Sequence, residues 1–167
     1  MDVRLRMVTL FVGVFFSCNT VAQELKTFGD SVAYAFGCSS AFGLSFDKKF
    51  DKFVCSGFEC GLAIYDSSYE KEAGNGNDCF SIDEAKQILM RTQSVADSVA
   101  YEADGVVMGF QGATDLYNLW QEAGKMDPLN LKLYLLGFKQ RRSKRMLLTQ
   151  QQIEILIDTL VEEVDSD

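Results

Sequence analysis

The chain of 167 residues contains no histidine. A nucleophile activated by histidine and a metal site built on imidazole are therefore excluded. The sequence also lacks a C-x-x-C pair, a glycine-rich phosphate loop after a strand, and the ligand spacing of an EF-hand calcium loop at residues 75–78. We expect no cofactor and no metal, and once the helical patterns are assigned no alternating segment typical of a β-strand is left.

Basic residues are fewer than acidic ones, 16 against 24, and the formal net charge is −8. A chain this acidic is not expected to bind nucleic acid or anionic lipid. The exception is a basic run at residues 139–145. We interpret it as a solvated helix end that compensates the helix dipole, and a docking patch for an acidic partner is the alternative.

Residues 1–22 have the pattern of a secretory signal peptide. A charged start and an apolar run over residues 7–16 precede a small-residue cleavage site at residues 20–22. The run is too short to span a bilayer, and a buried N-terminal helix is the alternative. Residues 16–18 loosely resemble a lipobox, which would place a lipid on Cys18. With either kind of processing the mature chain is exported to the periplasm or cell surface of a bacterium, and it meets a membrane only if Cys18 is lipidated.

Four cysteines follow the leader, namely Cys38, Cys55, Cys60 and Cys79. An even count in an exported chain indicates disulfides, with three possible connectivities. Cys55 and Cys60 lie five positions apart on one expected helix, so their side chains point about 140° apart and cannot bridge. An antiparallel neighbour would place Cys38 opposite Cys55 and leave Cys60 to Cys79. Four buried free thiols and, more remotely, a four-cysteine zinc site are the alternatives.

Beyond the leader the sequence indicates an internal repeat, with one copy over residues 23–93 and a second over residues 94–167. Asp-Ser-Val-Ala-Tyr occurs at residues 30–34 and again at residues 97–101. Gly-Phe pairs and capping patterns recur downstream, although the linker lengths differ between the copies. The expected fold is all-α, with about six helices arranged as two tandem, divergent three-helix modules packed together.

Local signals place the starts of these helices. Thr27 and Ser94 each stand three residues before an aspartate, which puts a hydroxyl at the N-cap and a carboxylate at N3. Ser81 and Thr149 open capping boxes. The chain then ends in a helical hairpin over residues 127–164, whose first helix has Asp127 as N-cap and Pro128 in its first turn.

Several glycines lie inside helical patterns: Gly37, Gly43, Gly105, Gly109 and Gly112. Each costs about 1 kcal/mol of helix stability relative to alanine. We interpret them as points where two helix backbones approach closely, and a frayed or kinked helix is the alternative.

Three segments of the second copy carry a family resemblance: D-S-V-A-Y at residues 97–101, L-N-L-K-L-Y-L-L-G-F-K at residues 129–139 and L-L-T-Q-Q-Q-I at residues 147–153. Together they resemble the N-terminal dimerisation module of the FKBP-type peptidyl-prolyl isomerases similar to the macrophage infectivity potentiator. The resemblance implies helices that interlock into a dimer and, in some members, a cleft that cradles unfolded clients. The catalytic β-rich domain of that family has no counterpart here, so it implies no isomerase activity.

We therefore expect a non-enzymatic helical protein that self-associates or holds client proteins in protein folding, as a homodimer or as an intramolecular pseudo-dimer. The abundance of aromatic residues, 13 Phe and 6 Tyr, motivates this expectation, although a plain core also uses them. A lipoprotein anchored through Cys18 with a structural role, and a thiol-exchange protein using Cys55 or Cys60, are the alternatives. The residues expected to carry packing or assembly are Tyr34, Phe58, Tyr101, Gly109, Leu133, Leu136, Gly137, Ile153, Ile157 and Leu160.

Overall fold

A computed structural model describes residues 25–69 and 79–165, and in these ranges the chain is all-α, as expected. The α-helices are α2 (Phe28–Ser40), α3 (Asp51–Tyr65), α4 (Ile82–Leu89), α5 (Asp97–Glu122), α6 (Leu131–Ser143) and α7 (Gln150–Val164). Short 3₁₀ helices, Lys48–Phe50 and Thr92–Ser94, precede α3 and α5. No strand occurs in these ranges, and none of these helices is long and apolar enough to cross a bilayer.

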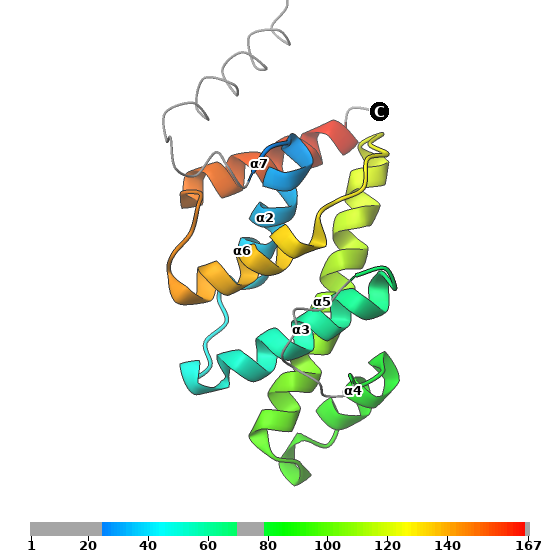
Figure 1. Cartoon of the computed structure of the whole chain (residues 1–167), viewed down its shortest axis with the longest axis vertical. Coiled ribbons are helices and arrows are strands. Elements are labelled where there is room, and N and C mark those ends of the chain that lie inside the picture. Colours follow the sequence, from blue (N-terminus) through cyan, green and yellow to red (C-terminus); the bar gives the residue numbers. More distant parts are fainter. Residues whose placement is uncertain (1–24, 70–78, 166–167) are drawn as a thin grey trace, which may run out of the picture.

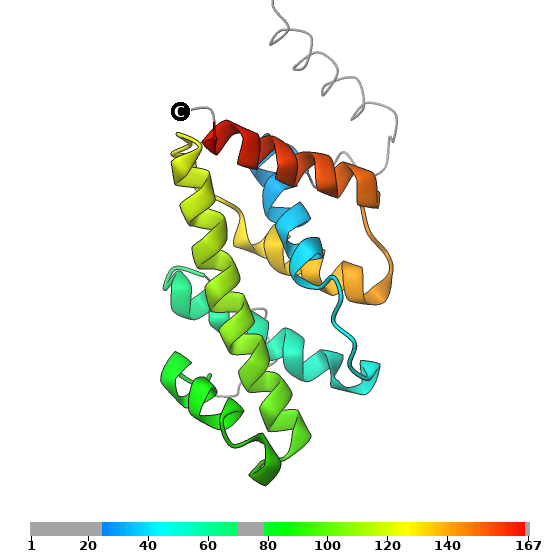
Figure 2. The same cartoon turned by 180° about the vertical axis from the view of Figure 1, so that it is seen from behind.

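The helices pack across the two expected copies rather than within them. α2 packs against α6 and α7, whereas the long α5 packs against α3 and α4 (Figures 1 and 2). By contrast, α2 hardly touches α3, and α6 hardly touches α5 or α7. The first helix of each half is therefore covered by the second and third helices of the other half.

Three of the expected helix caps are present, each as a capping box. The side chains of Thr27, Ser81 and Thr149 each accept a hydrogen bond from the backbone N–H three residues later. The side chain of that later residue in turn accepts from the backbone N–H of the cap residue. The expected cap at Ser94 is wrong. Ser94 ends a 3₁₀ turn, its hydroxyl donates to the Arg91 carbonyl at 2.9 Å, and the N-cap of α5 has no side-chain cap.

The expected hairpin over residues 127–164 is also corrected. α6 begins at Leu131, because the Asn130 side chain caps it by accepting from the N–H groups of Lys132 and Leu133. Residues 127–129 precede this cap and lie outside the helix. α6 and α7 follow one another along the chain, but both pack on α2 instead of on each other.

The core is continuous across the two halves. Phe58 of α3 stacks on Phe138 of α6 with ring centroids 4.2 Å apart, and it meets the Tyr134 ring edge-on at 5.3 Å. All three side chains are fully buried, as is Tyr34 on α2. Aromatic residues therefore join the pair of α3 and α5 to the pair of α2 and α6 in one core.

The residues expected to carry packing or assembly all lie in or against this core. Among them the buried ones are Tyr34, Phe58, Gly109, Leu133, Gly137, Ile153 and Leu160. The remainder, Tyr101, Leu136 and Ile157, are partly buried and pack against it.

Candidate functional site

The crossing of α2 and α6 is a direct contact between two helix backbones. A Cβ atom on Gly37 would overlap the Tyr134 carbonyl oxygen, and one on Gly137 would overlap the Tyr34 carbonyl oxygen. Both glycines are buried. Because backbone atoms cannot move aside as a flexible side chain can, only glycine fits at either position without separating the helices.

The crossing of α3 and α5 is built in the same way. A Cβ atom on Gly57 would overlap the Glu102 carbonyl oxygen, and one on Gly105 would overlap the Val54 carbonyl oxygen. Gly61 and Gly109 extend the close approach by about one turn. The interpretation of the helical glycines as points of close approach is therefore correct at Gly37, Gly105 and Gly109.

The interpretation fails at the other two helical glycines. Gly43 lies beyond the end of α2 at φ 79°, where no neighbour stands within contact distance of a Cβ atom, so it serves a turn. Gly112 is in α5, but it faces the Tyr134 hydroxyl and not a backbone. In sequence these two look the same as the others, because periodicity does not reveal which helix lies opposite.

The neighbours of the glycines correspond one for one between the two crossings. Gly37 faces the carbonyl of Tyr134 and the N–H of Phe138 on α6, and Gly105 faces the carbonyl of Val54 and the N–H of Phe58 on α3. In this correspondence Tyr34 of α2 is equivalent to Glu102 of α5. The repeated D-S-V-A-Y instead makes Tyr34 equivalent to Tyr101, one residue away. The repeated motif is therefore displaced by one residue relative to the equivalent packing positions.

The cysteines fulfil half of the expected pairing. Cys60 and Cys79 form a disulfide with their Cα atoms 5.6 Å apart. The expected bond between Cys38 and Cys55 is absent and both thiols are free, because α2 packs on α6 and not on α3. The Cys38 thiol instead donates to the Gly137 carbonyl at 3.4 Å.

Burial raises the pKa of both free thiols, Cys38 and Cys55, to about 11. A thiol with so high a pKa is almost entirely protonated near neutral pH and is a poor nucleophile. With Cys60 engaged in the disulfide, neither cysteine considered for thiol exchange presents a thiolate. No group of three or more potential metal ligands occurs in the described ranges.

Part of the basic run is used within the fold. Arg142 pairs with Asp51 at the start of α3 at 2.6 Å and donates to the Leu44 carbonyl at 2.8 Å. Arg141 donates to Gln150 at 2.6 Å and lies over the ring of Phe42. These two arginines tie the end of α6 to its neighbours and are not presented together as a docking patch.

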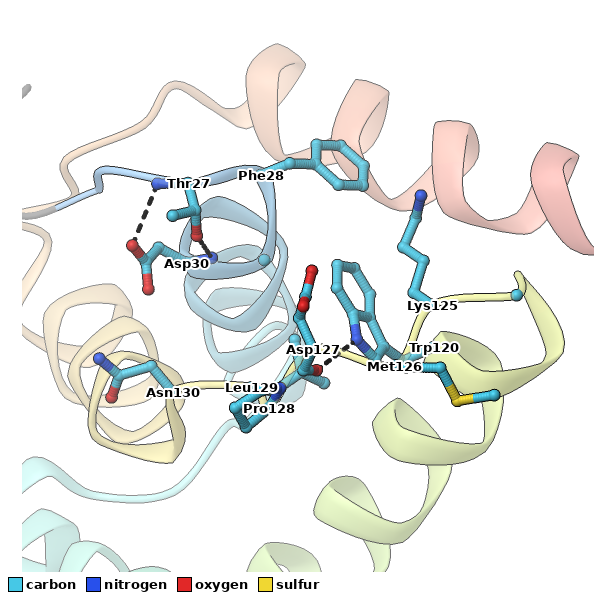
Figure 3. A pocket seen from close by; sticks show the side chains of 12 residues that line it. Thr27, Phe28, Asp30, Trp120, Lys125, Met126, Asp127, Pro128, Leu129 and Asn130 are labelled. Carbon is cyan, nitrogen blue, oxygen red and sulfur yellow. Dashed lines mark hydrogen bonds between the residues drawn. The ribbon is translucent and has the colours of Figure 1, made fainter.

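A groove was not anticipated from the sequence. Its cavity of about 790 Å³ lies between the first turn of α2, the end of α5 and the connection to α6, and is lined by residues 27–30, Trp120 and residues 124–130 (Figure 3). Concave sites of this size are where proteins most often bind ligands. We therefore take this groove as the candidate functional site.

The floor of the groove is aromatic. Trp120 is only 3% exposed, and its Nε1–H donates to the Asp127 carbonyl at 2.8 Å, a bond drawn in Figure 3. Its ring lies 6.0 Å from that of Phe28, centroid to centroid. Lys125 places its Nζ within 5.6 Å of both ring centroids and 3.0 Å from a carboxylate oxygen of Glu163, so its charge is engaged within the protein.

One wall of the groove is non-helical backbone. Pro128 has no N–H, and it biases the preceding Asp127 towards an extended conformation. In the described part of the chain, the backbone N–H groups of Met126, Asp127, Leu129 and Asn130 donate to no other group. These N–H groups are therefore not used for hydrogen bonds within the described part of the chain.

Comparison of the chain with models of known protein families, with curated proteins and with solved structures found no match. The resemblance to the isomerase dimerisation module therefore stays a prediction. The leader over residues 1–22, lipidation of Cys18 and the turn at residues 75–78 lie outside the described residues and stay predictions as well.

Proposed function

We propose that this chain is an exported, non-enzymatic helical protein that holds segments of partly unfolded client proteins, and that its two halves complete each other within one chain. The observation that supports the proposal best is the pair of glycine crossings with matching neighbours, α2 on α6 and α3 on α5. Each crossing joins one half of the chain to the other.

A single half could not bury its own apolar surface. Val32, Tyr34 and Cys38 of α2 are fully buried, yet α2 hardly touches α3 or α4 of its own half. Alone, the first half would expose this face to water at a cost of roughly 25 cal/mol per Å² of apolar area. Such a unit needs a second copy, and here the second half of the same chain supplies it. We therefore favour the intramolecular pseudo-dimer over the homodimer.

The groove and the apolar residues at its rim support the client-holding part of the proposal. Met126 at the rim is 89% exposed and stands next to the aromatic floor of Trp120 and Phe28. Methionine adapts to irregular apolar partners and is common on surfaces that bind many ligands. The resembled family implies the same activity, because some of its members cradle unfolded clients.

Suppression of aggregation tests the proposal. A heat-labile client enzyme is warmed with and without the protein, and light scattering is followed over time. We expect the protein to delay scattering, and Met126→Ser to weaken the delay. The matched control is Met90→Ser, because Met90 is 81% exposed and lies far from the groove along the chain, at the end of α4. Scattering unchanged by the protein, or an equal effect of both variants, would remove the client-holding function.

The thiol-exchange alternative finds no support among the described cysteines. The Cys60 sulfur is in a disulfide and the pKa of Cys55 is raised to about 11. The lipoprotein alternative depends on Cys18 and is tested separately, by incorporation of a fatty-acid analogue and its loss in Cys18→Ser.

A further inference from the structure

We propose that the groove recognises a client segment in an extended conformation, and that it selects an apolar side chain next to a basic one. The backbone at residues 126–130 pairs with the backbone of the segment, Phe28 and Met126 take the apolar side chain, and Asp127 faces the basic one. This inference rests on the proposed client-holding function and names the chemistry that the client presents.

The pairing with an extended segment is argued from the backbone of residues 126–130, which forms one wall of the groove. Met126 and Asp127 on one side of Pro128, and Leu129 and Asn130 on the other, have N–H groups without a partner in the described part of the chain. An extended peptide laid beside them offers carbonyl oxygens at regular intervals, as in strand addition to an open edge. A helical ligand has no such carbonyls to spare, because its own N–H groups use them.

The site for the apolar side chain of the ligand is argued from the aromatic residues of the groove. The rings of Trp120 and Phe28 lie 6.0 Å apart, centroid to centroid; Trp120 is buried, whereas Phe28 is only partly buried and Met126 beside it is exposed. A phenylalanine or leucine side chain of the ligand covers the exposed part of Phe28 and Met126. Burial of that apolar area supplies the driving force, while the backbone bonds fix direction and conformation.

The preference for a basic side chain is argued from the charged residues that line the groove. The one cation lining the groove, Lys125, is held by Glu163 and by the two aromatic rings. The carboxylate of Asp127 is exposed, has no ion-pair partner in the described ranges, and stands beside the indole of Trp120 in the open space of the groove (Figure 3). The Asp30 carboxylate, by contrast, is turned to the cap of α2, where it accepts from the backbone N–H groups of Lys26 and Thr27 (Figure 3). The groove is therefore complementary to a cationic ligand.

The chain contains a single tryptophan, Trp120, so its intrinsic fluorescence reports on this groove without a label. The probes are capped tetrapeptides without tryptophan: acetyl-Gly-Arg-Phe-Gly-amide, the same peptide with Glu or Gln in place of Arg, and an Arg-Phe peptide whose Gly-Arg and Arg-Phe amide groups are replaced by trans-alkene isosteres. These isosteres keep the extended shape of the peptide but have no carbonyl oxygen. We expect saturable binding of the Arg-Phe peptide. Loss of the two carbonyl acceptors should weaken binding about tenfold, because each lost hydrogen bond accounts for several-fold in affinity.

The charge requirement is tested with Asp127→Asn. This variant should bind the Arg-Phe peptide roughly threefold more weakly, as expected for a solvated ion pair, and the Gln-Phe peptide equally well. Asp158→Asn on α7 is the matched control, because Asp158 is exposed and does not line the groove. Equal binding of the Glu-Phe and Arg-Phe peptides, or equal losses in both variants, would overturn the charge selection. Full affinity of the alkene-substituted peptide would overturn the extended backbone pairing.

The two proposals fail in different ways. If no tetrapeptide changes the fluorescence while the protein still delays aggregation of a heated client, this inference falls and the client-holding function stands. If the Arg-Phe peptide binds as described but aggregation is unaffected, the groove is a peptide site and the client-holding function falls.

Discussion

Phe58 and Phe138 stack on each other with ring centroids 4.2 Å apart, and they occupy corresponding places in the two halves of the chain, each directly after a glycine at a helix crossing. A contact between two corresponding side chains is what an approximate two-fold relation between the halves, part of the pseudo-dimer that we propose, would produce. The relation links α3 with α6, and it places the centre of the core between the halves. On either side of this centre, α2 packs on α6 and α7, and α5 packs on α3 and α4.

Replacing a glycine at a crossing should destabilise the protein even though alanine favours helix. Gly37→Ala and Gly105→Ala each place a methyl group against a backbone carbonyl on the facing helix, and we expect each to lower the free energy of unfolding by at least about 2 kcal/mol. Urea unfolding followed by circular dichroism measures this.

Gly29→Ala is the matched control for both glycine variants. Its Cβ atom would meet only side chains, the Trp120 ring at 3.4 Å and Leu129 at 3.7 Å, so the helix propensity gained should leave stability unchanged or raised by less than about 1 kcal/mol. If the three variants behaved alike, the close approach of the backbones would not be what these glycines provide.

Removing the hydroxyl of Tyr34 should cost stability, whereas removing that of Tyr101 should not. The Tyr34 hydroxyl donates to the Gln140 side chain at 2.7 Å and accepts from the Leu147 N–H at 2.7 Å, so it joins α2 to α6 and to the segment before α7. We expect Tyr34→Phe to lower the unfolding free energy by about 1–2 kcal/mol, because both partners lose a bond in a partly buried place.

Tyr101 serves as the comparison because the repeated D-S-V-A-Y sequence makes it look equivalent to Tyr34. Its ring packs against Phe46 and Phe50, but its hydroxyl makes no hydrogen bond in the described ranges. Tyr101→Phe should therefore change stability by less than about 0.5 kcal/mol. A similar loss in both variants would restore the pairing of the two tyrosines and contradict the one-residue displacement.

The disulfide between Cys60 and Cys79 should stabilise α4 against the rest of the fold. It closes a loop with a sequence separation of 19 residues, for which chain entropy gives about 3 kcal/mol. Replacement of both cysteines by serine should lower the urea midpoint accordingly, and reduction should have no further effect on that variant. Mass spectrometry of an unreduced digest should find the Cys60–Cys79 peptide pair with Cys38 and Cys55 free, and a Cys38–Cys55 pair would contradict the packing of α2 on α6.

Stability should fall at alkaline pH in a way that depends on the two free thiols. Burial raises the pKa of Cys38 and Cys55 from 9.0 to about 11, so the folded state holds these protons more tightly than the unfolded state. The stability they contribute is complete below pH 9 and is lost as the pH rises from 9 towards 11. The decline in unfolding free energy over that window should be smaller in the Cys38→Ser, Cys55→Ser double variant, and an identical decline would show that other groups cause it.

The local features of the fold were predictable from the sequence, and the helix pairing was not. The caps at Thr27, Ser81 and Thr149 depend on residues three apart, so a short stretch of sequence contains the whole signal. Which helix faces α2 depends on residues a hundred positions away, and the antiparallel neighbour assumed for Cys38 was therefore wrong. The glycines predict that two helices approach closely, but they do not predict which helix lies opposite.

The groove was missed although part of its signal was present. Asp127 followed by Pro128 fits a helix cap and first turn, but a proline also favours an extended conformation in the residue before it. Asn130 is an equally good N-cap, and it is the one used. The bond from Trp120 to the Asp127 carbonyl, which holds the wall of the groove, joins two elements and has no local signature.

The claim that the two halves complete each other within one chain is tested most directly by cutting the connection between them. A protease site inserted at Gln93, in the exposed link between α4 and α5, allows the folded full-length chain to be cleaved in place. The mass of the cleaved material is then measured by light scattering after size exclusion. The account predicts one complex with the mass of a single uncut chain, containing both halves in equal amounts. Separation into two folded halves, or a complex of twice that mass, would contradict it.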